Sequence, residues 1–331
     1  MDALSLSVVI PYFQREHGIL RRSVLSALKQ EGFGGFDIII VDDGSPVPAI
    51  EEVADLVHAH PNRIAVIRQQ NRRAGAARNA ALDRVPASRR YVALLDSDDE
   101  WEPYHLATAV EVLARGYDCY FSNLYNLGEQ LSKFEKEEQT GFSGRLRSDE
   151  ICPLEGLPDC WEFRGDMFDR VLFSGNLIMP STFVYDFSKF PNVRFREDFW
   201  RFGEDIIFLA DMAARQARFG FSSRPAVRRG HGVNMFDKAG WGTPGFPARL
   251  CDEMAIYKHA ARSWHLTKAQ SHYCREKFAR IRGDFVSTCG AQLSRLDFSQ
   301  LSQLLRFARL DPMFPILLPL LLARSIGKKL A

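Results

Sequence analysis

Three aspartates stand close together in Asp96-Ser97-Asp98-Asp99, directly after the apolar run from Tyr91 to Leu95. Such a run is typical of a buried strand, so the carboxylates are expected at its carboxyl end. Carboxylates that water cannot solvate shift their pKa, pair with a base or bind a metal, and oxygen ligands suit Mg²⁺ or Mn²⁺. A divalent ion here could hold a diphosphate. Asp and Ser also favour plain turns and helix starts, so both interpretations stay open.

Two further segments have residue types that could bind a nucleotide. In Asp42-Asp43-Gly44-Ser45 a carboxylate could accept hydrogen bonds from a ribose or a base, although a turn with a helix cap has the same composition. In residues 71–79 small residues permit close approach of the backbone, and arginines stand near a helix start. Both features favour phosphate, and the alternative is an Ala-rich helix with a solvated basic face.

An aromatic ring and a second acidic pair complete the set of candidates. Phe13 follows the first apolar run and could stack on a base, or it could simply belong to the core. Glu204-Asp205 precedes an apolar helical run, where the helix dipole favours acidic residues in any case. A carboxylate there could instead take a proton from an attacking hydroxyl as a general base.

Short β-rich runs alternate with amphipathic segments through the first third of the chain. Strands are predicted at 6–10, 36–41, 64–68 and 91–95, and helices at 20–30, 50–59 and 76–85. This alternation predicts an α/β fold with a mostly parallel sheet flanked by helices. Ligands of such sheets bind at the carboxyl ends of the strands, where the candidate residues are therefore expected to gather.

The later part of the chain is less regular. Residues 124–175 are interpreted as loops and insertions near the site, a helix is predicted from 204 to about 217, and the chain beyond Pro247 is expected to be largely helical. We therefore predict one domain over 1–246, with a nucleotide-binding half at 1–123 and an acceptor-side half at 124–246. A helical C-terminal extension is predicted over 247–331.

The composition excludes several classes of protein. The 331 residues are 46% hydrophobic and 25% charged, as in ordinary globular proteins, and a net charge of +2 gives no reason to expect a nucleic acid partner. The six cysteines lack the spacing of zinc ligands and are interpreted as reduced thiols. The first residues show no basic segment followed by an apolar signal region, so a cytoplasmic location is expected.

In this order the motifs resemble glycosyltransferase family 2, inverting enzymes of the GT-A fold that use nucleotide-activated sugars. The resemblance covers about residues 5–235 and is carried by five segments: 7–16, 41–45, 75–82, 95–99 and 203–205. It implies a Rossmann-like GT-A sheet, a nucleotide-diphosphate sugar as donor, and Mn²⁺ or Mg²⁺ as cofactor. The residues that it implies for binding the nucleotide sugar are Pro11, Phe13, Glu16, Asp43, Arg78, Asp96 and Ser97.

The resemblance also implies the metal ligand and the catalytic group. Asp98 would bind the metal within a DxD motif, and Asp205, with Glu204 beside it, would be the catalytic base. His231 stands where some relatives have a histidine that completes the metal site, although a polar loop residue is the alternative. The opening loop departs from the family pattern, because Phe13 replaces the usual Tyr and Gln14 the usual Asn; stacking survives while a hydroxyl contact is lost.

These features predict an inverting glycosyltransferase of cell-surface polysaccharide biosynthesis. It would move a hexosyl or N-acetylhexosaminyl group to a hydroxyl of a saccharide or lipid-linked saccharide, and an oligomer is compatible with the sequence. Residues 172–176 and Ser181-Thr182 are expected on the acceptor side. The rival interpretations are a non-catalytic nucleotide-sugar-binding subunit and a sugar nucleotidyltransferase, whose Gly-rich first loop is absent after Ile10.

The end of the chain is apolar over 313–323 and is followed by Arg324, Lys328 and Lys329. It is shorter than the roughly 20 residues that span a bilayer. A segment over 311–331 could instead lie at the inner face of the membrane as a peripheral contact, with its cations near anionic lipid. A core-packing helix or a dimer contact is the alternative.

Overall fold

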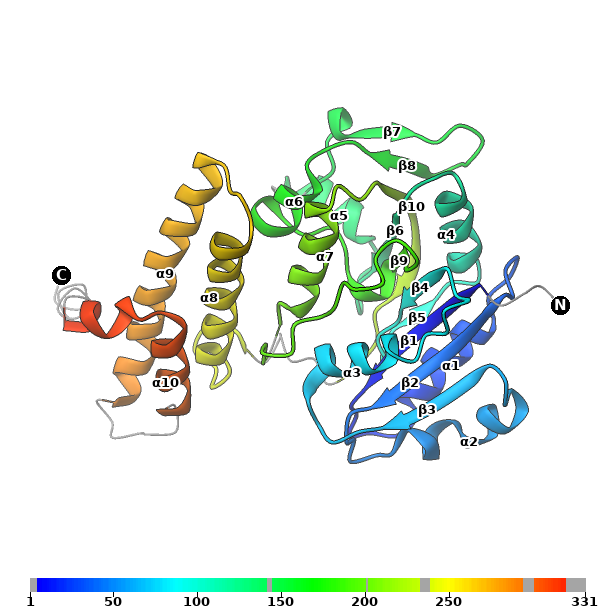
Figure 1. Ribbon diagram of the computed structural model, residues 1–331, viewed down its shortest axis with the longest axis horizontal. Helices are drawn as coiled ribbons and strands as arrows, with labels where there is room; N and C mark the ends of the chain where they lie inside the picture. The colour runs from blue at the N-terminus through cyan, green and yellow to red at the C-terminus, as the bar shows by residue number, and fades with distance from the viewer. Residues whose placement is uncertain (1–4, 142–144, 201, 233–238, 294–300, 320–331) are drawn as a thin grey trace. The chain divides into compact units, whose positions relative to one another are not determined.

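The computed structural model describes residues 5–141, 145–200, 202–232, 239–293 and 301–319, without the side chains of 289–293. Contacts divide the chain into two compact units (Figure 1). The first unit comprises residues 1–197 and 205–233, and the second comprises 198–204 and 234–331. The predicted functional limits at 123, 246 and 247 stay a prediction, because contacts alone do not assign function.

The first four main strands of the first unit form the predicted parallel sheet, in the order β3-β2-β1-β4. These strands are β1 (Leu6–Tyr12), β2 (Phe36–Asp42), β3 (Ile64–Arg68) and β4 (Tyr91–Leu94). The helices that connect and follow them are α1 (Ile19–Leu28), α2 (Ala49–Ala59), α3 (Arg73–Leu82) and α4 (His105–Ala114). Leu6, Val8 and Ile10 of β1 are fully buried, and so is Val9 on the opposite side of the strand. Burial on both sides is the reason that these strands are continuous apolar runs.

Antiparallel strands extend the sheet beyond β4. β9 (Phe183–Asp186) pairs antiparallel with both β4 and β6 (Cys119–Tyr125), and β10 (Phe219–Arg228) pairs parallel with β6. The hairpin of β7 (Ile151–Pro153) and β8 (Cys160–Phe163) follows antiparallel to β10, whose far end also pairs with β5 (Glu100–Trp101). The prediction of a mostly parallel sheet flanked by helices is confirmed.

The interpretation of 124–175 as loops was wrong in part. This region contains the β7-β8 hairpin and also α5 (Lys133–Thr140), α6 (Met167–Asp169) and the π-helical turn η2 (Arg170–Ser174). A capping box between Ser132 and Glu135 begins α5, and Gly141, at a φ of 63°, ends it. No residue of α5 is buried, so its charged sequence has no apolar periodicity to reveal it.

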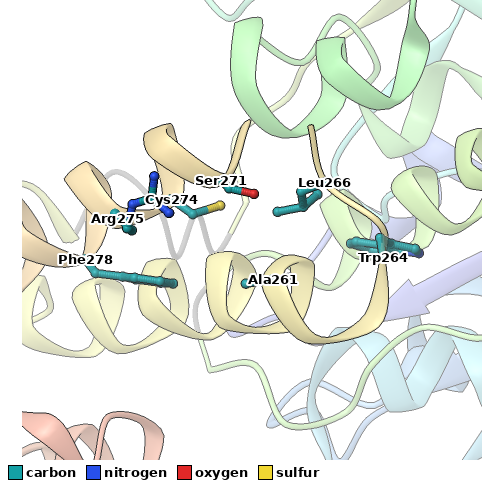
Figure 2. A pocket seen from close by; sticks show the side chains of 7 residues that line it. All are labelled: Ala261, Trp264, Leu266, Ser271, Cys274, Arg275 and Phe278. Atoms are coloured by element: carbon teal, nitrogen blue, oxygen red, sulfur yellow. The ribbon is translucent and has the colours of Figure 1, made fainter. Parts of the chain in front are cut away.

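The second unit is helical, as predicted for the chain beyond Pro247. Its helices are α8 (Phe246–Ser263), α9 (Lys268–Leu293) and α10 (Leu301–Leu310). Where α8 passes into α9, a small pocket of about 230 Å³ is lined by apolar side chains, a thiol and a guanidinium (Figure 2). The lining residues are Ala261, Trp264, Leu266, Ser271, Cys274, Arg275 and Phe278. None of the helices described here is long and apolar enough to cross a membrane.

His105, the first residue of α4, is a fully buried histidine inside the core of the first unit. Its ring contacts Trp101 at 4.8 Å and Tyr120 at 5.9 Å between ring centroids, and within the described part of the chain neither ring nitrogen has a hydrogen-bond partner. Burial lowers the pKa of His105 to about 3, so the folded protein holds this ring neutral.

The substitution His105→Leu is expected to reduce the dependence of the free energy of unfolding on pH below neutrality. Between the pKa near 6.5 of an unfolded histidine and the folded value of about 3, the unfolded state binds more protons, so stability falls as the pH falls. This group contributes at most about 1.4 kcal/mol per pH unit to that slope. Urea unfolding between pH 7 and pH 5 measures it, with exposed His58→Gln as the control; equal slopes for H105L and the wild type would contradict the prediction.

Candidate functional site

The carboxyl ends of β1, β2 and β4 bring the candidate residues together at one edge of the sheet. In the parallel register Tyr12 is opposite Asp42, and the Asp43 amide donates to the Tyr12 carbonyl at 2.9 Å. From the other side, the Gln14 amide group donates to the Ser97 hydroxyl at 3.2 Å. The predicted gathering of these segments at one edge is therefore present in the structure.

The two aspartates after β2 have different environments. Asp42 accepts the amides of Ser45 at 2.7 Å and Ala49 at 3.0 Å, so it caps the turn and the start of α2. Asp43 accepts hydrogen bonds at 2.7 to 2.8 Å from the Gln69 side chain and from the amides of Arg72 and Arg73. A carboxylate offers about four acceptor positions, so Asp43 fixes the start of α3 and keeps about one position for a ligand.

The opening loop presents a partly exposed aromatic ring at the same edge. Pro11 and Phe13 are half-buried, whereas Gln14 is buried and Glu16 is exposed before α1. The half-buried ring of Phe13 leaves part of its face available for stacking on a flat ligand. The structure therefore places Phe13 and Pro11 at the edge of the sheet and Glu16 further out on the loop.

Arg78 of α3 is the buried cation of this edge. Its side chain is 5% exposed and donates to a carboxylate oxygen of Asp96 at 2.7 Å. The guanidinium also lies over the ring of Phe195, 5.2 Å from its centroid. Sequence analysis predicted that Arg78 faces a diphosphate; in the structure it is paired with Asp96, so a phosphate group would have to share this guanidinium with the carboxylate.

Asp99 supports the acidic turn. Its carboxylate is buried and accepts the Ser181 hydroxyl at 2.6 Å and the Gly230 amide at 3.1 Å. Burial, with the neighbouring charges of Asp96 and Asp98, raises the pKa of Asp99 to about 7. Ser181 also accepts the Asp96 amide at 3.0 Å. Ser181 and Thr182 are both buried, and Ser181 holds the acidic turn in place; their expected position on the acceptor side stays a prediction.

Asp98 differs from Asp99, because within the described residues its carboxylate receives no hydrogen bond or ion pair from another residue. Burial and the charge of Asp96 raise its pKa to about 6, although Arg229 and Arg78 oppose the shift. A half-buried carboxylate without a partner is suited to binding a cation. Of the three aspartates in the turn, Asp98 is therefore the best candidate for a metal ligand.

Two glycines bring the chain after β10 against Asp98. A Cβ atom on Gly230 would lie 1.7 Å from the Asp98 carbonyl oxygen, and one on Gly232 would lie 2.0 Å from an oxygen of the Asp98 carboxylate. His231, between them, is exposed. The described residues contain no cluster of three or more His, Cys, Asp or Glu side chains that could hold a metal by themselves. Sequence analysis missed both glycines, although the Gly-His-Gly spacing is the signal that could have revealed them.

Asp205 stands in the first turn of α7 (Glu204–Ala214), and both Glu204 and Asp205 are half-buried. Burial raises the pKa of the Asp205 carboxyl, the charge of Arg78 opposes that shift, and the charge of Asp96 adds to it. Asp205 therefore interacts electrostatically with the ion pair at the sheet edge. A carboxyl with a raised pKa takes up a proton more readily than an ordinary aspartate, as a general base must.

The chain is similar to known proteins in sequence and in fold. Residues 7–172 match the family described as Glycosyl transferase family 2. The chain is 34% identical over 249 residues to the succinoglycan biosynthesis protein ExoW of Rhizobium meliloti (strain 1021). The matched residues make up 73% of this chain and 73% of ExoW. It is 29% identical over 197 residues to the GalNAc(5)-diNAcBac-PP-undecaprenol beta-1,3-glucosyltransferase of Campylobacter jejuni. These residues make up 59% of this chain and 56% of that protein.

Two solved structures share the fold at low sequence identity. The crystal structure of S. aureus TarS 1-349 in complex with UDP-GlcNAc has a TM-score of 0.55 and 18% identity, covering 94% of this chain and 80% of that one. The mannosyltransferase PcManGT from Pyrobaculum calidifontis, in complex with GDP-Man and Mn²⁺, has a TM-score of 0.50 and 13% identity. The match covers 99% of this chain and 87% of that one. Both likenesses support the predicted fold.

Replacing Gly230 by alanine is expected to destabilise the first unit by about 1–3 kcal/mol, because its Cβ would overlap the Asp98 carbonyl and force the backbones apart. Urea unfolding measures the loss. Gly34→Ala is the control, since a Cβ on Gly34 meets nothing within 4 Å. A G230A protein as stable as the G34A protein would show that the close approach to Asp98 is not a real constraint.

Proposed function

The chain belongs to glycosyltransferase family 2, and from that premise we propose that it is an inverting enzyme with a nucleotide-diphosphate sugar as donor. The acceptor is a hydroxyl of a saccharide or lipid-linked saccharide, and the sugar is of the hexosyl or N-acetylhexosaminyl type. The names of the relatives, a succinoglycan biosynthesis protein and a GalNAc(5)-diNAcBac-PP-undecaprenol beta-1,3-glucosyltransferase, support a role in cell-surface polysaccharide biosynthesis.

The observation that carries this proposal is the position of Arg78. It is bonded to Asp96, and its charge acts on the pKa of Asp205. The candidate base and the acidic edge of the sheet therefore interact electrostatically. Transfer between two bound substrates requires the base to be held close to the donor site. Neither a simple turn at Asp96 nor an ordinary acidic first turn of α7 would require this coupling.

A divalent cation fits the residues at this edge. The Asp98 carboxylate has a raised pKa and no partner among the described residues, and the chain around His231 packs against it. Mg²⁺ and Mn²⁺ sites commonly combine one or two protein ligands with substrate phosphates, so a set of three protein ligands is not needed. We propose that Asp98 and His231 hold Mn²⁺ or Mg²⁺, which when bound neutralises charge on the departing diphosphate.

The nucleotide is proposed to lie along the sheet edge. Phe13 and Pro11 would contact the base, with Glu16 further out on the same loop, and the remaining acceptor position of Asp43 would receive a donor from the base or ribose. Asp96 and Ser97 would lie on the ribose side, and Arg78 would contribute positive charge toward the phosphates.

Asp205 is proposed to remove the proton from the acceptor hydroxyl as that oxygen attacks the anomeric carbon. The new bond forms on the face opposite the departing nucleotide diphosphate, so one displacement inverts the configuration. The proton ends on the Asp205 carboxyl, whose raised pKa favours taking it up. Glu204, the preceding residue, contributes negative charge beside the base.

The substitution Asp205→Asn is expected to lower transfer by at least about 100-fold while the affinity for the donor stays within a few fold, because general-base catalysis typically contributes 10²–10⁴. Asp98→Asn should instead weaken Mn²⁺-dependent donor binding. A screen of nucleotide sugars, with transfer followed by product analysis and binding by calorimetry, identifies the donor and measures both effects. Wild-type turnover by D205N would rule Asp205 out as the base, and binding without transfer to any acceptor would favour a non-catalytic subunit.

We also propose a peripheral contact with the inner face of the cytoplasmic membrane through residues 311–331, of which 320–331 lie outside the described residues. Met313 and Ile316 are 49% and 69% exposed. Leu301 and Leu305 of α10 are also exposed, and so is Arg309. Apolar side chains with nearby cations suit an interface of anionic lipid.

The double substitution of Met313 and Ile316 by glutamine should therefore reduce flotation with vesicles of anionic phospholipid several-fold. This change is cleaner than deletion of 311–331, because deletion also removes Asp311, whose buried carboxylate binds Lys258 and Arg282. The control is Ile50→Gln, which removes an exposed apolar side chain from α2. Undiminished flotation of the double variant would refute the contact, and a concentration-dependent change in oligomeric state would favour a dimer surface.

A further inference from the structure

We propose that Asp252 of α8 and Arg306 of α10 are positioning residues for catalysis. Together they fix residues 198–204, the segment that leads directly into the catalytic base Asp205. This inference rests on the proposed function, because it assigns a purpose to the second unit only if Asp205 acts as the base. Every contact that supports it lies within that unit.

Asp252 is a fully buried carboxylate that binds the backbone of this segment. It accepts the amide of Trp200 at 3.0 Å with one oxygen and the amide of Phe202 at 3.4 Å with the other. Hydrogen bonds to an ionised acceptor are stronger than those between neutral groups. A single side chain on α8 thus holds two amides that stand two residues apart.

Arg306 supplies the compensating charge and a third attachment. Its guanidinium donates to Asp252 at 2.5 Å and to the carbonyl of Asp198 at 3.1 Å. It also lies over the ring of Trp200, 4.9 Å from the ring centroid. Since a buried carboxylate is costly without a cation, Arg306 both stabilises Asp252 and fixes the start of the segment.

Gly203 fixes the other end. Its φ of 113° lies in the region that favours glycine, and a Cβ there would stand 2.8 Å from the Ile256 side chain of α8 and 2.9 Å from the Phe199 ring. The next residue, Glu204, begins α7, and Asp205 follows it. The segment is therefore attached at Asp198, Trp200 and Phe202 and is sterically confined at Gly203.

The position of a general base must be accurate, because a displacement of about 1 Å can cost a factor of about 100 in rate. If Asp252 and Arg306 serve this purpose, losing them should lower kcat far more than it changes nucleotide affinity, which depends on the sheet edge. If they merely stabilise the helical unit, their loss should lower stability without a selective effect on kcat.

Arg282 gives a matched control within the same unit. Like Arg306, it donates to a fully buried carboxylate, that of Asp311, at 2.5 and 3.0 Å. No described hydrogen bond or ion pair joins Arg282 to residues 198–204. Arg306→Gln and Arg282→Gln therefore each remove an arginine from a fully buried carboxylate, although Asp311 keeps its ion pair with Lys258, and only the first loosens the segment before Asp205.

We expect D252N and R306Q to lower kcat by about 10- to 100-fold with a donor KM and a nucleotide Kd within about twofold of the wild type. R282Q should keep its kcat, and R306K should recover part of the loss. Hydrogen exchange supplies a readout independent of activity: the amides of Trp200 and Phe202 should exchange faster in D252N and R306Q and remain protected in R282Q.

Equal kcat values for R306Q and R282Q, with transfer abolished in D205N, would overturn this inference and leave the proposed function standing. Wild-type transfer by D205N would rule Asp205 out as the base and so overturn this inference as well, whereas binding of a nucleotide sugar without transfer to any acceptor by the wild-type protein would refute the proposed function itself. If D252N does not fold, R306Q decides the question alone, and unchanged exchange at Trp200 and Phe202 in R306Q would refute the attachment directly.

Discussion

The buried guanidinium of Arg78 is the interaction on which the site depends. The carboxyl ends of parallel strands bring Asp43, Asp96, Asp98 and Asp99 to one edge of the sheet, and α7 adds Asp205. Burial and the charge of Asp96 raise the pKa of Asp98, Asp99 and Asp205. Arg78 pairs with Asp96 and opposes the rise in pKa at Asp98 and Asp205, so it favours the ionised form of both carboxyls.

Three of these carboxylates, Asp43, Asp98 and Asp99, differ in how many hydrogen bonds they accept. Asp43 and Asp99 have their acceptor positions largely filled by neighbouring amides and side chains, and they fix α3 and the chain after β10. Asp98 has no such partners in the described residues, and Gly230 and Gly232 permit the close approach that encloses it. Because the neighbours of Asp98 are held by their own contacts, the position of the Asp98 carboxylate is well defined before any cation binds.

In the second unit, too, two buried carboxylates bind different groups. Asp252 and Arg306 form a buried ion pair that also binds backbone groups of 198–204, whereas Asp311 binds Lys258 and Arg282 within the helices. A buried pair contributes little net stability compared with apolar packing, but it specifies one arrangement of the groups it binds. Such specificity is what the proposed positioning of residues 198–204 before Asp205 would need.

From the sequence alone we predicted the fold class, the alternation of strands and helices up to β4, and the candidate residues. This was possible because buried parallel strands are continuous apolar runs and polar motifs follow their ends. The sequence did not reveal α5, whose charged sequence has no apolar periodicity, or β7 and β8, which are short. The family resemblance already separated Asp98, as the metal ligand, from Asp43 and Asp96, as residues that bind the nucleotide sugar, but the sequence carries no information on the hydrogen-bond partners of these carboxylates. Only the tertiary structure decided which of them are saturated by hydrogen bonds and which is available, because their partners Gln69, Ser181 and Gly230 come from distant parts of the chain. Hydrogen bonding and burial set the charge and reactivity of a carboxylate, and both arise from contacts that local sequence does not encode.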